Sequence, residues 1–229
     1  MGLKIKNSKN IVTDGLVLNL DASDSISNPG SGSTWYDRSG QGSNGTLVNG
    51  IVFSSVNGGV LSCDGSNDYV SLSLSKTAEC SFSCWAKSSE TSVSAISEML
   101  FNASSNGDGP DLFFTGSKIS WNTWDSSNNL FCTMPSLVAD GNYHQYFVVC
   151  DAAAETATLY IDGVSYGTAD HTAARHQSKL TSSNNMYIGG TSNGYQWKGN
   201  IGEFKMYNKK LTVAEIIQNY NATKSRFGL

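Results

Sequence analysis

Two segments of the chain carry aromatic and amide side chains in a mixture that is typical of sugar-binding sites. The first reads ISWNTWDSSNN and the second reads SNGYQWKGN. A flat aromatic ring can cover the apolar face of a pyranose, and amide or carboxylate oxygens on a rim can bind its hydroxyl groups. The candidate ligand-binding residues are Trp121, Trp124, Asp125, Asn193, Tyr195, Gln196 and Trp197. The alternative is that each tryptophan packs in the core, because most tryptophans are largely buried.

A third segment, CDGSNDY, brings oxygen-bearing side chains close together in sequence. Asp64, Asn67 and Asp68 would offer the hard oxygen ligands that Ca²⁺ prefers. Asp-Gly and Asn-Asp are also ordinary turn sequences, and the turn interpretation is favoured. Ca²⁺ is therefore a candidate cofactor at these three residues, and no other cofactor is predicted.

The spacing of the carboxylates argues against catalysis. A glycoside hydrolase needs two carboxyl groups, about 5 Å apart when configuration is retained. On one strand such a pair would occupy positions i and i+2 or i+4, and no predicted strand has acidic residues at that spacing. His144, His171 and His176 lack the sequence context of a nucleophile elbow. The sequence predicts a non-enzymatic protein, with a glycoside hydrolase as the less favoured alternative.

The composition excludes other classes of protein. The net charge of −4 argues against nucleic acid as a partner, because its binders usually carry a basic face. No apolar run approaches the roughly 18 residues of a membrane span, and the start of the chain lacks the apolar core of a signal peptide. The five cysteines show no CxxC spacing, and Cys80 and Cys84 would lie about 13 Å apart on one strand. Buried free thiols are the expected state.

The clearest structural signal is a β-hairpin in TATLYIDGVSYGT, residues 156–168. A two-residue Asp-Gly loop suits a type I′ turn, because both central residues need positive φ. The pairs predicted by this turn are Ile161 with Val164 and Leu159 with Tyr166. The period-2 alternation of a strand then places all four side chains on one face.

Similar strand signals recur about every 8 to 12 residues, and no Pro/Ser-rich linker divides them. Near the C-terminus, Thr212 and Glu215 form a capping-box sequence that predicts a short helix. The predicted fold is all-β, a two-sheet antiparallel β-sandwich with one short C-terminal helix. Residues 1–14 are predicted to be an N-terminal polar segment, and residues 15–229 a single domain.

Motifs spread along nearly the whole chain carry a family resemblance. They read, in order, WYDRSG, CDGSNDYV, FSCW, GNYH, LYIDG, IGG and GNIGEFKMY, followed by LT and EI at the predicted helix. This series resembles the laminin-G/pentraxin-like branch of the concanavalin A-like lectin/glucanase superfamily. The resemblance implies a lectin-like jelly roll whose concave face commonly binds glycans or proteins, often beside a bound Ca²⁺.

The two ends of the chain carry a narrower resemblance. The opening GLVLNLDASDSISNPGSGSTWYDRSGQGSNGTL and the ending NYNATKSRFGL are similar to domains of bacteriophage structural proteins, including tail-fibre and head-associated components. This similarity implies a virion protein assembled in the host cytoplasm. The expected function is to bind a host-surface polysaccharide or another glycan through a concave or loop-rim site. Expected partners include other virion proteins and further copies of the chain, and the alternative is a structural virion protein that acts through oligomeric assembly.

Overall fold

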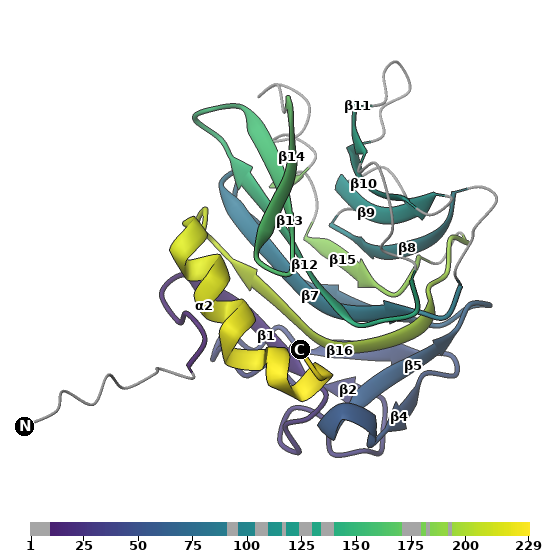
Figure 1. Cartoon of the computed structure of the whole chain (residues 1–229). Helices are drawn as coiled ribbons and strands as arrows, with labels where there is room; N and C mark the ends of the chain where they lie inside the picture. The colour runs from purple at the N-terminus through teal and green to yellow at the C-terminus, as the bar shows by residue number, and fades with distance from the viewer. Residues whose placement is uncertain are drawn as a thin grey trace, which may run out of the picture.

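The strands of the computed structural model form two antiparallel sheets that pack face to face (Figure 1). The structure describes residues 10–90, 96–103, 110–115, 118–123, 130–133, 140–170, 180–181, 184–191 and 194–229. Sheet A consists, in spatial order, of β14 (Val164–Asp170), β13 (Thr156–Ile161), β12 (His144–Asp151), β7 (Cys80–Ser88), β16 (Lys198–Tyr207), β5 (Val60–Asp64) and β4 (Val52–Ser54), with β1 (Leu16–Asp21) also paired to β16. Sheet B consists of β11 (Leu130–Thr133), β10 (Lys118–Thr123), β9 (Pro110–Thr115), β8 (Ile96–Asn102), β15 (Asn185–Ile188), β6 (Tyr69–Ser73), β3 (Gly45–Val48) and β2 (Thr34–Trp35). The all-β sandwich predicted from the sequence is confirmed.

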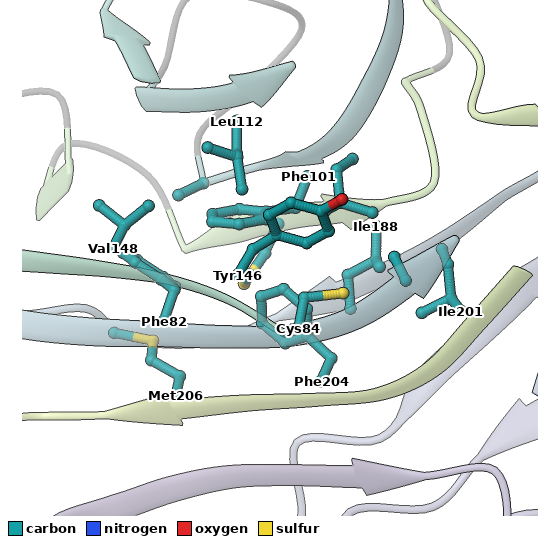
Figure 2. Close-up of a cluster of buried hydrophobic side chains, with 14 of the residues drawn as sticks. Phe82, Cys84, Phe101, Leu112, Tyr146, Val148, Ile188, Ile201, Phe204 and Met206 are labelled. Atoms are coloured by element: carbon teal, nitrogen blue, oxygen red, sulfur yellow. The ribbon is translucent and has the colours of Figure 1, made fainter. Parts of the chain in front are cut away.

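Alternation along the strands builds the core between the two sheets. On β7, Phe82, Cys84 and Ala86 face sheet B, whereas Trp85 points to the opposite side. The ring centroids of Phe82 on sheet A and Phe101 on sheet B lie 5.2 Å apart. Figure 2 shows side chains from both sheets meeting in this cluster. Removal of this apolar surface from water is the main force that holds the sheets together.

The predicted hairpin is present, and its turn is confirmed. Asp162 and Gly163 join β13 to β14 with φ values of 53° and 81°. Both values lie in the left-handed region that a type I′ turn requires. Ile161 pairs with Val164 across the turn, as the sequence predicts.

The register beyond the turn differs from the prediction. Leu159 pairs with Gly167 and not with Tyr166. The reason is a bulge, which shifts the register between the Tyr160–Ser165 pair and the Leu159–Gly167 pair. Leu159 and Ile161 are buried, whereas Val164 and Tyr166 are 59% and 50% exposed. The prediction that all four share one buried face is therefore wrong for the β14 pair. β14 is an edge strand of sheet A, and its apolar side chains remain in solvent.

Helix α2 (Val213–Thr223) lies on the outer side of sheet A, away from sheet B (Figure 1). The predicted capping box is confirmed, since Thr212 Oγ1 accepts from the Glu215 amide at 3.3 Å and Glu215 Oε2 accepts from the Thr212 amide at 2.8 Å. Ile216 packs against the sheet, whereas Ile217 is 42% exposed. No helix among the described residues has the length and apolar character needed to cross a bilayer.

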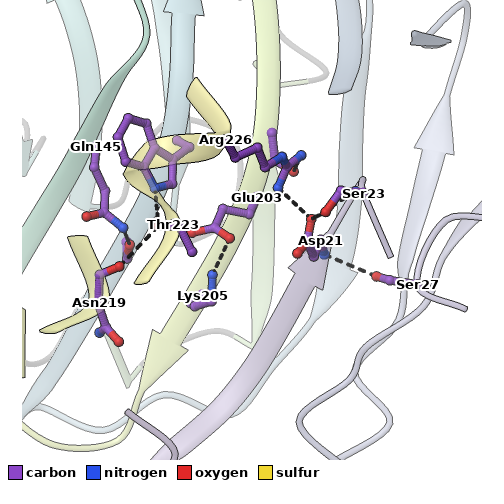
Figure 3. Close-up of polar contacts among 12 residues, drawn as sticks. Asp21, Ser23, Ser27, Gln145, Glu203, Lys205, Asn219, Thr223 and Arg226 are labelled. Carbon is purple, nitrogen blue, oxygen red and sulfur yellow. Dashed lines mark hydrogen bonds and ion pairs between the residues drawn. The ribbon is translucent and has the colours of Figure 1, made fainter. Parts of the chain in front are cut away.

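The 3₁₀ segment η2 (Lys224–Phe227) carries the contacts that fix the C-terminus to the sandwich. Arg226 Nη1 lies 2.7 Å from Asp21 Oδ1 on β1, and its Nε donates to the Asn57 carbonyl, in the 3₁₀ segment η1 (Val56–Gly58), at 2.7 Å. The Phe227 ring stacks on Trp85, with centroids 4.3 Å apart. Figure 3 shows the ion pair of Arg226 with Asp21 among the polar contacts on this side of sheet A.

Candidate functional site

Trp121 and Trp197, two of the sugar-binding candidates, lie in the core between the sheets. They are 1% and 0% exposed. The Trp121 ring lies 6.1 Å from Phe82 and 5.9 Å from Phe101, and Trp197 packs edge-on against Phe114 at 4.9 Å. Neither indole presents a face to solvent, so the expectation of exposed sugar-binding rings is corrected for both. Large rings at these positions fill the space between the sheets, where burial stabilises the fold most.

The second candidate segment has one exposed aromatic residue in the described structure. Gln196 is buried, and its Nε2 donates to the Thr191 carbonyl at 2.6 Å. Its side chain fills the space beside Gly190, where a Cβ would lie 1.9 Å from Gln196 Oε1. Tyr195 is 45% exposed. Gln196 therefore has a structural role, and Tyr195 remains a candidate. The predicted residues Trp124, Asp125 and Asn193 lie outside the described residues.

The calcium candidates form a hydrogen-bonded turn between β5 and β6. Asp68 is 1% exposed, and its two carboxylate oxygens accept from the amides of Gly50 at 2.6 Å and Asp64 at 3.0 Å. Asp64 Oδ1 accepts from the Ser66 amide at 2.7 Å. Within the described residues, no group of three or more His, Cys, Asp or Glu side chains is arranged to hold a metal. The geometry agrees with the turn interpretation of Asp64 and Asp68, and Asn67 contributes its carbonyl to Asn49 Nδ2 at 2.5 Å.

A different set of residues forms an aromatic and polar surface on sheet B. We call it the tyrosine face: Tyr69 and Ser71 on β6, Tyr187 on β15 and Thr46 on β3, all on the side of sheet B that points away from sheet A. Ser71 pairs with Thr46 on one side and with Tyr187 on the other. The two tyrosine rings meet edge to face, with centroids 5.9 Å apart. Their inner neighbours Val70 and Ile188 face the core, which fixes the direction of the tyrosines.

The tyrosine face combines ring surface with hydroxyl groups and carries no charge. Tyr69, Ser71 and Tyr187 are partly exposed, and Thr46 is exposed. Half-buried rings are held in place by their neighbours, so little side-chain entropy is lost when a ligand stacks on them. The phenol and hydroxyl groups can both donate and accept hydrogen bonds. This chemistry suits a neutral, hydroxylated ligand.

A buried polar pair continues this row along sheet B. Asn102 on β8 pairs in register with Tyr187 and, on its other side, with Asp111 on β9. Asn102 Nδ2 donates to Asp111 Oδ1, and the two residues are 0% and 1% exposed. A buried carboxylate needs such partners, because an unpaired one would be costly. The pair therefore lies beside Tyr187, on the side of sheet B that points away from sheet A.

A separate hollow of about 290 Å³ opens near β4. Its lining includes Pro29, Asn28 and Phe53. Around it, Ile26, Val52 and Val56 are 62%, 61% and 57% exposed. This end of the molecule therefore presents apolar side chains, in contrast to the aromatic and hydroxyl surface of the tyrosine face.

Sequence comparison places the chain in a family. The profile described as the concanavalin A-like lectin/glucanases superfamily matches residues 64–217. The chain belongs to this superfamily. The matched range begins at Asp64 and ends in α2, so it includes β6 and β15, which carry the two tyrosines and Ser71, and β8 and β9, which carry the buried polar pair. Thr46 on β3 lies outside the matched range. A search of curated protein sequences finds no match.

Solved structures of the same fold include receptor-binding domains of clostridial toxins. The binding domain of botulinum neurotoxin serotype D superposes with a TM-score of 0.71 at 15% identity, covering 91% of this chain and 52% of that one. The binding domain of Paraclostridial Mosquitocidal Protein 1 gives 0.71 at 13% identity, covering 92% and 52%. A structure of botulinum neurotoxin type C, described as entering cells through two ganglioside molecules, gives 0.71 at 12%, covering 93% and 52%. The chain spans about half the length of these solved structures. At these identities, the similarity establishes the fold alone.

The tyrosine face was missed in the sequence because its residues are far apart in the chain. Tyr69 and Tyr187 are brought together only by the pairing of β6 with β15. Each strand taken alone shows the alternation of a strand with one buried face. In YVSLS and NMYI, buried apolar residues alternate with polar or tyrosine residues. The sequence alone did not predict which strands are neighbours in the sheet.

Proposed function

We propose that this chain is a non-enzymatic carbohydrate-binding module whose tyrosine face binds a neutral saccharide. The observation that carries the proposal is the edge-to-face contact of Tyr69 and Tyr187, 5.9 Å between centroids, on the side of sheet B that points away from sheet A. One ring can lie under the apolar face of a pyranose while the other borders its edge. Ser71 and Thr46, in the same row, provide hydroxyl groups for the hydroxyls of the sugar.

The structural relatives support this proposal. They include a domain named as receptor-binding, a binding domain in complex with SialylT, and a structure of a toxin whose cell entry depends on two ganglioside molecules. Another is in complex with the protein rat synaptotagmin II. These ligands belong to those toxins. This chain covers about half the length of those structures, and they support the proposal as binding proteins that contain this fold.

The distribution of carboxylates supports a role in binding over hydrolysis. Among the residues of sheet B whose side chains are described, Asp111 is the one that carries a carboxylate. It is buried and hydrogen bonded to Asn102. Glu203, the carboxylate on β16, is 1% exposed on the helix-covered side of sheet A and lies 2.5 Å from Lys205 Nζ. Hydrolysis by two carboxylates needs both to flank a bound substrate, and these two lie on different sheets.

The source of the saccharide follows from the resemblance of the two chain ends to bacteriophage structural proteins. We propose a place in a virion, with a polysaccharide of the host surface as the ligand. We also propose that Ca²⁺ can bind Asp64, Asn67 and Asp68. This turn leads directly into β6, whose first residue is Tyr69, so a bound ion would lie next to the tyrosine face.

The proposal is tested with a glycan array that includes bacterial surface polysaccharides, followed by calorimetric titration of each hit with and without Ca²⁺. The expected result is saturable binding of a neutral saccharide that changes little between 50 mM and roughly 500 mM salt, because no charged pair is formed. Binding that requires Ca²⁺ would assign a role to the Asp64 turn. The absence of binding to every glycan under both conditions would contradict the proposal.

A second candidate function, oligomeric assembly, is favoured by the apolar end of the molecule. β4 is one of the two end strands in the described order of sheet A, and its Val52 and Phe53 are exposed. An edge strand can pair with the same strand of a second copy in an isologous dimer, which would also cover these side chains. Analytical ultracentrifugation tests this: a dimer that is lost in Val52→Lys supports assembly, and a monomer at all concentrations contradicts it.

A further inference from the structure

Cys80 and Cys150 lie directly opposite each other on neighbouring strands of sheet A. Cys80 is the first residue of β7, Cys150 is the next-to-last residue of β12, and the two are register partners in the antiparallel pair. Directly opposed residues in such a pair have Cα atoms about 4.5 or 5.5 Å apart, depending on the hydrogen-bonding position. Both separations fall in the range of roughly 4.4 to 6.8 Å that a disulfide can span.

The side chains of the two cysteines also point in the same direction. Both are 0% exposed and belong to the core cluster between the sheets. The interaction with the Cys150 thiol, together with burial, raises the pKa of Cys80. Both cysteines are free thiols.

Cys63 and Cys84, the other cysteines whose side chains are described, have no such partner in reach among the described residues. Cys84 lies on the same strand as Cys80, four residues further on, at about 13 Å along the strand. Cys63 lies on β5, and β16 separates this strand from β7. Cys63 and Cys84 are therefore two strand spacings apart, or about 9.6 Å, which exceeds the reach of a disulfide.

We propose that Cys80 and Cys150 are a thiol–disulfide site, which a low-molecular-weight disulfide such as oxidised glutathione converts into a cross-strand disulfide. One cysteine thiolate attacks a sulfur of the reagent, a protein–glutathione disulfide forms, and one glutathione thiolate leaves. The second cysteine thiolate attacks the protein sulfur of this mixed disulfide and displaces the second glutathione. Two cysteines lose two electrons and two protons, and the reagent gains them as two molecules of reduced glutathione.

The location of the site determines when the exchange takes place. Both thiols are buried, so a reagent reaches them when the end of β7 opens or while the chain folds. The ammonium group of Lys76, whose pKa burial lowers to about 8, lies close enough to favour the Cys80 thiolate. Oxidation is therefore expected to be slow in the folded protein and fast during refolding in a glutathione redox buffer.

The test is refolding of the full chain in oxidised and reduced glutathione, followed by alkylation of the remaining thiols and peptide mapping by mass spectrometry. The expected product is one cross-linked peptide pair containing Cys80 and Cys150, with Cys63 and Cys84 alkylated. Because the disulfide closes a long loop, its formation is expected to raise the Tm by roughly 10 °C, and reductant should reverse the increase. A cross-link through another cysteine, a persistent glutathione adduct, or alkylation of both thiols after refolding would overturn the proposal.

Two variants distinguish the pair from general thiol chemistry. Cys150→Ser should abolish the cross-link and the reductant-sensitive increase in Tm, whereas Cys84→Ser, a buried cysteine of the same strand as Cys80, should retain both. Retention of the cross-link in Cys150→Ser would contradict the assignment. If Cys150→Ser does not fold, the peptide map of the unmodified chain still decides the question.

Discussion

The imidazole of His144 joins the start of β12 to the hairpin turn between β13 and β14. Its Nδ1 lies 2.6 Å from Asp162 Oδ2, and its Nε2 lies 3.2 Å from Asp140 Oδ1. The other carboxylate oxygen of Asp162 accepts from the Gln145 amide at 2.9 Å. Asp162 was expected to serve only the turn, and the structure shows that it also fixes the turn to the neighbouring strand.

This contact predicts a pH-dependent stability. Burial alone would lower the pKa of His144, but the hydrogen bonds and charges of Asp162 and Asp140 outweigh burial and raise it. A raised pKa means that the folded protein favours the imidazolium. The stabilisation is therefore fully present below the unfolded-state pKa of about 6.5 and is lost as the pH rises through the folded-state pKa.

The measurement is urea unfolding of the wild type and His144→Gln between pH 5 and pH 9. We expect the wild type to exceed the variant by about 1 to 2 kcal/mol at the acidic end, and we expect the difference to shrink as the pH rises. Asp140→Asn should reduce the pH dependence less than Asp162→Asn, because the Asp140 contact is longer. A difference between wild type and His144→Gln that is constant with pH would contradict this explanation.

Arg226 is expected to be the residue that fixes the C-terminus most strongly. Its guanidinium pairs with Asp21 and donates to the carbonyls of Asn57, Gly59 and Gly202. Removal of it leaves a partly buried carboxylate and several carbonyls without their donor. We expect Arg226→Ala to lower the free energy of unfolding by about 3 kcal/mol.

The matched control is Ser225→Ala, its exposed neighbour, which should change the unfolding free energy by less than about 0.5 kcal/mol. Both variants are compared by denaturant unfolding. Equal stabilities for the two variants would show that the Arg226 contacts do not stabilise the fold.

Trp197 and Tyr195 provide a second matched comparison, which tests the corrected assignment of the tryptophans. Trp197 is fully buried, whereas Tyr195, two residues earlier, is exposed. We expect Trp197→Ala to lower the unfolding free energy by about 3 to 5 kcal/mol through the cavity that it leaves, and Tyr195→Ala to change it by less than about 0.5 kcal/mol. A Trp197→Ala protein of unchanged stability would show that the ring does not contribute to the core.

The sequence predicted the features of the fold that depend on local pattern. The Asp162–Gly163 turn and the Thr212–Glu215 capping box are decided by residues close in the chain, and both are present. The pairing of Leu159 with Gly167 could not be predicted, because a bulge leaves no clear mark in the sequence.

The binding residues were harder to predict for a related reason. A tryptophan is as suitable for the core as for a sugar site. The two roles differ in whether the side chain points between the sheets or toward solvent. Trp121 and Trp197 are in the core, while Tyr69 and Tyr187, far apart in sequence, meet on the surface. The side-chain alternation of each strand was readable, but the neighbours of β15 in the sheet were not.

The central claim is that the tyrosine face binds the saccharide, and Tyr187 tests it most directly. The measurement is calorimetric titration of a saccharide identified on the glycan array into the wild type, Tyr187→Ala and Tyr166→Ala. Tyr166 is an exposed tyrosine of sheet A and serves as the matched control, and thermal unfolding confirms that each variant is folded. We expect at least a roughly tenfold loss of affinity in Tyr187→Ala, about 1.4 kcal/mol, and no change in Tyr166→Ala. Wild-type affinity in a folded Tyr187→Ala protein would contradict the claim.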